Sequence, residues 1–189
     1  MDNLEHEAAI EILTHYLTTK SLSVKKRFFN YAFYPIKEFL LDLLDILKQD
    51  LEIYIIGSLV NCTKVFHMVS YQKPLPVSDV DIKIVTKPAE VRSIGKVLTS
   101  KDVENLRKRL FNTTGIRIEF FVSSKKPPYG LRLENSTSIS DLYKRLSKLH
   151  SKRNVQEFLS KIFKSSIKVS PESISSARER PPPDLGFRI

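Results

Sequence analysis

Residues 77–85 read VSDVDIKIV and place two aspartates inside a run that is otherwise apolar and β-branched. Aspartate is depleted in β-strands, so the pair requires either a solvent or a chemical explanation. Side chains alternate across a strand, and residues two apart therefore share a face. We predict a strand whose core face carries Val80, Ile82 and Ile84. Its polar face carries Asp79, Asp81 and Lys83.

The same pattern recurs at 116–122, where IRIEFFV places Glu119 on the face opposite the regularly spaced apolar side chains. If the two strands are neighbours in one sheet, Glu119 converges with Asp79 and Asp81. Like charges that close resist ionisation unless a cation offsets them. Mg²⁺ accepts one or two carboxylates and fills its octahedron with water and phosphate oxygens, and paired ions about 3.5–4 Å apart support displacement at phosphorus. The alternative is a solvated sheet face whose acidic residues have no chemical role.

A third strand is predicted at 51–57, LEIYIIG, which is apolar on both faces as a central strand should be. Gly57 at its end permits a tight turn and close backbone approach. Ser58 can then open a helix whose free N–H groups suit a phosphate. An ordinary strand-turn-helix junction with a capping serine explains the same residues.

In chain order, Gly57-Ser58, Asp79-x-Asp81 and Glu119 resemble the motifs of the nucleotidyltransferase superfamily typified by DNA polymerase β, especially its minimal nucleotidyltransferase branch. The resemblance covers residues 51–122 and implies an α+β fold, a small mixed β-sheet flanked by helices. It implies that Gly57 and Ser58 hold the phosphates of a nucleoside triphosphate. It also implies that the three acidic residues bind Mg²⁺ or Mn²⁺ and serve catalysis, in which a nucleoside monophosphate is transferred and pyrophosphate is released.

The sequence departs from the family pattern in three ways. Twenty residues separate Ser58 from Asp79, Glu119 stands where aspartate is more usual, and a second glycine beside the serine is absent. These departures leave a second hypothesis open, a catalytically inactive module of the same fold that binds nucleic acid or a partner protein. Lys83 can contact a phosphate of the nucleotide or form a surface ion pair.

The positive charge of the chain is concentrated in one segment. Residues 1–122 hold 17 Lys and Arg against 15 Asp and Glu, whereas residues 123–168 hold 11 against 3, within a net charge of +10. A confined basic excess is typical of a polyanion-binding surface, although a solvated helical face is the alternative. We predict that a nucleic-acid acceptor is held by five side chains: Lys144, Arg145, Lys148, Lys152 and Arg153.

Helices are predicted from apolar spacing and from capping residues. The first spans 4–19, a second short one is less clear within 23–34, and a third begins at Pro35 and runs to residue 50. Residues 87–112 are largely helical, with Ser100 as an internal cap and Gly115 as the stop. Two basic amphipathic helices are predicted at 139–149 and 153–165.

Length and composition indicate one domain over residues 1–168, followed by a flexible Pro-, Ser- and Arg-rich tail at 169–189 that could dock on a protein partner. Cys62 is the only cysteine, which excludes an intramolecular disulfide. The histidines show no zinc-ligand spacing. Acidic residues stand where a signal peptide would be basic, and no apolar run reaches membrane-spanning length, so we expect a cytoplasmic protein without a membrane partner.

Overall fold

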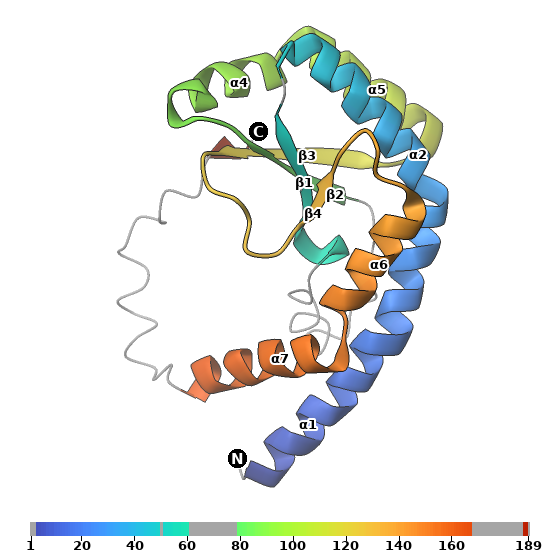
Figure 1. Ribbon diagram of the computed structural model, residues 1–189, viewed down its shortest axis with the longest axis vertical. Helices are drawn as coiled ribbons and strands as arrows, with labels where there is room; N and C mark the ends of the chain where they lie inside the picture. The colour runs from blue at the N-terminus through green and yellow to red at the C-terminus, as the bar shows by residue number, and fades with distance from the viewer. Residues whose placement is uncertain (1–2, 50, 61–78, 168–186, 189) are drawn as a thin grey trace.

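The computed structural model describes residues 3–49, 51–60, 79–167 and 187–188 (Figure 1). Its centre is a small mixed sheet with the strand order β4-β1-β2-β3-β5. The strands are β1 (Glu52–Ile56), β2 (Asp79–Val85), β3 (Arg117–Ser123), β4 (Leu131–Leu133) and β5 (Phe187–Arg188). Helices flank this sheet, so the predicted α+β fold is confirmed.

The central strands β2 and β3 run parallel, whereas β1 is antiparallel to β2. The other two pairs, β1 with β4 and β3 with β5, are also antiparallel. The three predicted strands are therefore neighbours in one sheet, in the order β1-β2-β3. Strand β4 was not predicted. Strand β5 lies within the segment predicted as a flexible tail, at the outer edge of β3.

The helices agree with most of the predicted boundaries. They are α1 (Asn3–Tyr16), α2 (Leu22–Leu47), α4 (Val91–Leu98), α5 (Lys101–Thr114), α6 (Ile139–Leu149) and α7 (Lys152–Ile167). Ser100 caps α5 by accepting a hydrogen bond from the N–H of Val103, and Gly115 ends it with a left-handed φ of 73°. Short 3-10 turns lie at η2 (Gly57–Leu59) and η3 (Pro88–Glu90).

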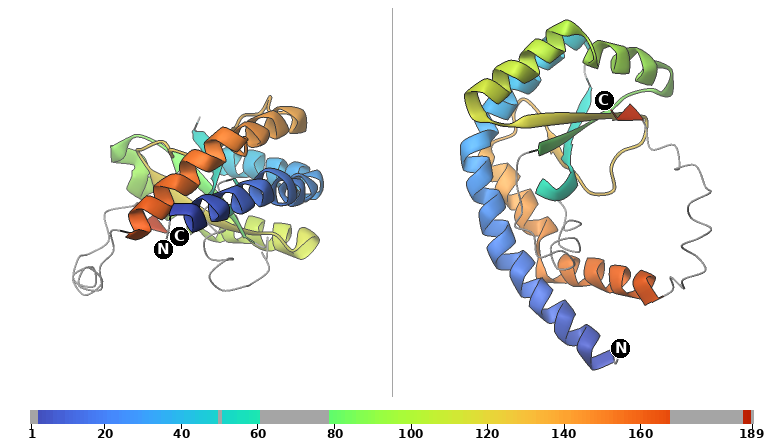
Figure 2. Two further views of the ribbon diagram at one scale, coloured as in Figure 1. Left: turned by 90° about the horizontal axis from the view of Figure 1, so that it is seen from below. Right: turned by 180° about the vertical axis from the view of Figure 1, so that it is seen from behind.

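The prediction that Pro35 begins a helix is wrong. A π-helical turn, η1 (Leu17–Ser21), joins α1 to α2, and Pro35 lies inside α2. Proline in a helix interior removes one backbone hydrogen bond. Apolar side chains on either side, Phe33 and Ile36 among them, are buried in the core and hold this turn in place. The resulting long helix curves along one side of the molecule (Figure 2).

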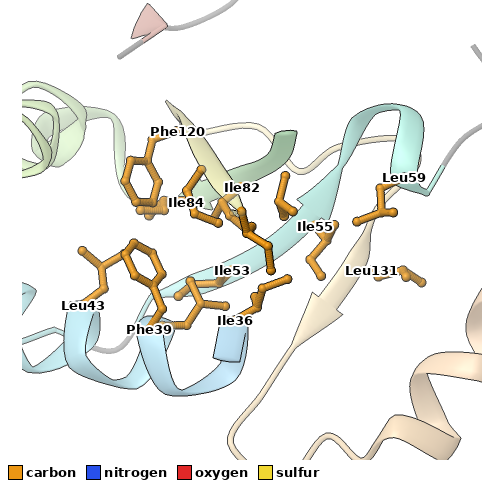
Figure 3. Close-up of a cluster of buried hydrophobic side chains, with 14 of the residues drawn as sticks. Ile36, Phe39, Leu43, Ile53, Ile55, Leu59, Ile82, Ile84, Phe120 and Leu131 are labelled. Atoms are coloured by element: carbon orange, nitrogen blue, oxygen red, sulfur yellow. The ribbon is translucent and has the colours of Figure 1, made fainter. Parts of the chain in front are cut away.

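The main core lies between α2 and one face of the sheet (Figure 3). Val80, Ile82 and Ile84 of β2 are fully buried there, as the alternation of the sequence predicts. Phe39 of α2 stacks on Phe120 of β3 with 6.1 Å between ring centroids. Buried residues of α4, α5 and α6 belong to the same cluster, so this face of the sheet is closed by helices.

A second, smaller apolar cluster joins α1 to α7 through Leu17, Val155 and Leu159. A buried polar contact lies where α2 meets the end of α6. There Lys25 Nζ lies 2.9 Å from His150 Nε2, and His150 Nδ1 lies 3.0 Å from the carbonyl oxygen of Leu146. Lys25 therefore belongs to the interior. Within the described residues, no helix is long and apolar enough to cross a membrane.

Candidate active site

The second face of the sheet carries the acidic residues that the sequence singled out. Asp81 of β2 is the register partner of Glu119 on β3 and of Ile56 on β1. Neighbouring strands lie about 4.8 Å apart, so the backbones that carry Asp81 and Glu119 are adjacent. Asp79 is paired in register with Arg117 instead. All three acidic residues are half-buried.

Gly57 lies directly against Asp81 at the end of β1. Its φ is 75°, a conformation that L side chains rarely adopt. A Cβ atom at this position would lie only 2.0 Å from Oδ2 of Asp81. Glycine is therefore required here both by the backbone conformation and by the close approach of the carboxylate. The sequence signal for this contact was the glycine that follows the apolar strand.

Ser58 lies in the 3-10 turn η2 and is half-buried. The helix predicted to begin at Ser58 is described only as far as Val60, because residues 61–78 lie outside the described part of the chain. In the described residues, a tight turn begins at Gly57.

The donor set suits a metal ion held by two carboxylates better than one held by three. Within the described part of the chain, no group of three or more His, Cys, Asp or Glu side chains is placed to hold a metal ion. Asp81 and Glu119 are adjacent, whereas the neighbour of Asp79 in the sheet is a cation, Arg117. Because Mg²⁺ needs only one or two carboxylates when phosphate and water supply the rest, these two residues fit such an ion.

Lys83 lies on the same polar face, in register with Tyr54 on β1 and Phe121 on β3. Partial burial lowers the pKa of Lys83, because its ammonium group loses solvation between these two aromatic residues. Tyr54 is buried, and its hydroxyl donates to Glu52 over 2.7 Å. A phosphate placed beside Lys83 would stabilise its charged form.

A groove of about 420 Å³ opens beside the first residues of β2 and β3. Asp79 and Glu119 line it on the sheet side. The residues that complete it are Glu104, Arg107, Lys108 and Phe111 of α5, with Arg117 and Ile118 of β3. The sequence analysis did not predict a role for the α5 residues. The signal that could have identified them is Phe111, an aromatic side chain in the last turn of that helix.

The five basic residues predicted to bind nucleic acid are all exposed on α6 and α7. Two of them have protein partners. Arg145 donates to the carbonyl oxygen of Arg132 over 2.7 Å, and Arg153 pairs with Glu157 at 3.3 Å. The Arg145 contact covers a carbonyl of the edge strand β4, a common way to protect a sheet edge.

The basic surface is longer than predicted, because Lys161 and Lys164 continue it along an open groove on α7. Their spacing from Arg153 and Glu157 is helical, which is the signal that could have identified them. Lys161 and Val60 also line one small cavity of about 140 Å³. The basic surface of α7 therefore comes close to Val60, three residues after Gly57.

Comparison of the chain with protein-family models, with curated proteins and with solved structures finds no match.

Proposed function

We propose that the protein is a metal-dependent nucleotidyltransferase that moves a nucleoside monophosphate from a nucleoside triphosphate to a nucleic-acid acceptor. The observation that carries this proposal is the contact of Gly57 with Asp81, beside Glu119 on the adjacent strand. A glycine without a side chain, pressed against a carboxylate at a strand end, creates a place where phosphate oxygens and the carboxylates can share one cation.

In this proposal, Asp81 and Glu119 would hold the metal ion, and the ion would supply positive charge beside the phosphates. The turn at Gly57 and Ser58 and the ammonium of Lys83 bind the triphosphate. The acceptor hydroxyl oxygen forms a bond to the α-phosphorus while the bond from that phosphorus to the bridging oxygen breaks. Pyrophosphate leaves with the bonding electron pair, and the hydroxyl proton passes to Glu119 or to water. Positioning and charge neutralisation supply most of the rate gain in such reactions.

The test is a transfer assay with each labelled nucleoside triphosphate, Mg²⁺ or Mn²⁺, and RNA, DNA or protein acceptors. Wild type should label one class of acceptor, and Asp81→Asn and Glu119→Gln should each lower the rate at least about 100-fold, because even supporting residues of metal sites are worth 10- to 100-fold. Asp45→Asn, at an exposed position of α2, is the matched control. Transfer that is unchanged in Asp81→Asn contradicts the proposal.

A non-catalytic module that binds nucleic acid is the second candidate. It is favoured by the absence of a three-carboxylate group in the described residues and by the exposed basic surface of α6 and α7. In that case no acceptor is labelled, and Asp81→Asn binds nucleic acid as tightly as wild type or more tightly. Lys148→Gln and Lys152→Gln should then remove most of the salt-dependent affinity.

A further inference from the structure

The groove between α5 and the start of β3 combines an aromatic ring, cations and two of the predicted site carboxylates. Phe111 is 42% exposed, so its ring is accessible from the groove. The guanidinium carbon of Arg117 lies 5.2 Å from the centre of that ring. A guanidinium over an aromatic ring keeps its N–H donors at its edge, where they can reach a phosphate.

The other cations of the groove are held by the protein and fix its shape. Arg107 donates to the carbonyl oxygen of Ile118 over 2.8 Å, and its guanidinium faces the ring of Phe120. Lys108 pairs with Glu104 at 2.6 Å on the exposed side of α5. The two Arg107 contacts hold α5 against the start of β3, and they fix Phe111 of α5 beside Arg117 of β3.

We propose that this groove binds single-stranded nucleic acid, with one base stacked on the Phe111 and Arg117 pair and the adjoining phosphate bound by Arg117. The proposal rests on the proposed function, because it assigns the acceptor side of the same site. A strand whose end lies on this platform points its terminal hydroxyl toward Asp79 and Glu119, which line the same groove.

The chemistry of the groove favours nucleic acid over an acidic peptide. A peptide carboxylate would meet Asp79, Glu104 and Glu119, whereas a base presents a neutral, flat face to the ring. Stacking of bases on aromatic side chains is independent of sequence and is worth about 1–3 kcal/mol per base. Under this proposal the basic surface of α6 and α7 holds a more distant part of the acceptor, or none of it.

Binding is measured without nucleotide or metal, by fluorescence anisotropy of a short single-stranded RNA labelled at its 5′ end with fluorescein. Phe111→Ala and Phe111→Leu should each weaken binding at least about fivefold, and Phe111→Tyr should restore it, because only the tyrosine keeps a ring for stacking. Tyr34→Ala removes an exposed aromatic ring from a different helix, α2, and should bind the RNA as wild type does.

Arg117→Gln should weaken binding and lower the slope of log affinity against log salt by about one, the value for one lost phosphate contact. Arg92→Gln, an exposed arginine of α4, is its control. Unchanged binding in both Phe111→Ala and Arg117→Gln overturns the proposal, as does a wild-type protein that does not bind the RNA. Equal weakening in the control variants also overturns it.

Cross-linking locates the end of the strand. An RNA with a 3′-terminal 4-thiouridine should cross-link to peptides of α5 or of the start of β3, and cross-links confined to α6 and α7 overturn the proposal. If the RNA binds through Phe111 but no nucleotide is transferred, the groove stands and the proposed catalysis fails. If transfer occurs while binding is insensitive to Phe111, the groove proposal fails and the catalysis stands.

Discussion

The two faces of the sheet are built from alternate residues of the same strands, yet they have opposite properties. On one face, the side chains of Val80, Ile82 and Phe120 are fully buried beneath helices. On the other face, Asp81 and Glu119 lie side by side and half-exposed. The difference teaches that one face supplies the apolar core of the fold, while the second face carries its charged side chains.

Adjacent phenylalanines on opposite faces test this division most strongly. Phe120→Ala should lower the free energy of unfolding by about 3–5 kcal/mol, because a fully buried ring leaves a cavity. Phe121→Ala, one residue further along β3 on the polar face, should cost less than half as much. Urea unfolding followed by circular dichroism measures both. Equal losses would show that the second face is also a core.

The buried pair of Lys25 and His150 sharpens the comparison by placing polar groups on the apolar side. Burial, reinforced by the charge of Lys25, lowers the pKa of His150 from 6.5 to about 4. The unfolded chain therefore binds a proton more readily than the fold below pH 6.5. The free energy of unfolding should fall by about 2 kcal/mol from pH 7 to pH 5, with the loss complete only below pH 4.

Urea unfolding at several pH values measures that slope. His150→Asn should remove most of it, whereas His15→Asn, at an exposed position on α1, should leave it unchanged. A slope that persists in His150→Asn would assign the pH dependence to other groups.

A comparison of Gly57 with Gly115 separates the effect of a left-handed backbone conformation on stability from the effect of the contact with the Asp81 carboxylate. Gly57 and Gly115 have nearly equal φ values of 75° and 73°, but a Cβ at Gly115 would meet no atom within 4 Å. Alanine at Gly115 should therefore lower the free energy of unfolding by about 1–2 kcal/mol, and alanine at Gly57 should lower it further because its Cβ also meets Asp81. Only Gly57→Ala should displace Asp81 and abolish nucleotide transfer. Retained transfer in Gly57→Ala would separate this turn from the site.

Replacement of Lys83 should have the smallest effect on the free energy of unfolding. Because partial burial disfavours its charged form, Lys83→Met should leave the free energy of unfolding unchanged or raise it by less than about 1 kcal/mol. The same variant should weaken triphosphate binding, measured by isothermal titration calorimetry. Lys87→Met, at an exposed site just after β2, is the control. A clear loss of stability would assign Lys83 a structural role.

Much of the fold could be predicted because local patterns coincide with tertiary packing. The alternation in residues 79–85 predicts both faces of β2, and the serine before α5 and the glycine after it predict its ends. Pro35 was misassigned because packing on both sides of it outweighs the local preference of proline for a first turn. Strand β4 is too short for its three residues to show a period.

The candidate site could be predicted only in part, because register and long-range contacts are absent from local sequence. Alternation places Asp79 and Asp81 on one face, but the register alone pairs Glu119 with Asp81 and Arg117 with Asp79. The groove at Phe111 depends on how α5 packs against β3. The pair of Lys25 and His150 joins residues 125 positions apart, a separation that no local pattern indicates.

The most direct test of the central claim does not require the acceptor to be known. Electron paramagnetic resonance can measure Mn²⁺ binding in the presence and absence of a nonhydrolysable nucleoside triphosphate analogue. The account predicts a Mn²⁺ site that forms with the analogue and is lost in both Asp81→Asn and Glu119→Gln, while the exposed Asp45→Asn retains it. Mn²⁺ binding that does not depend on the analogue, or that is unchanged in both variants, would contradict the account.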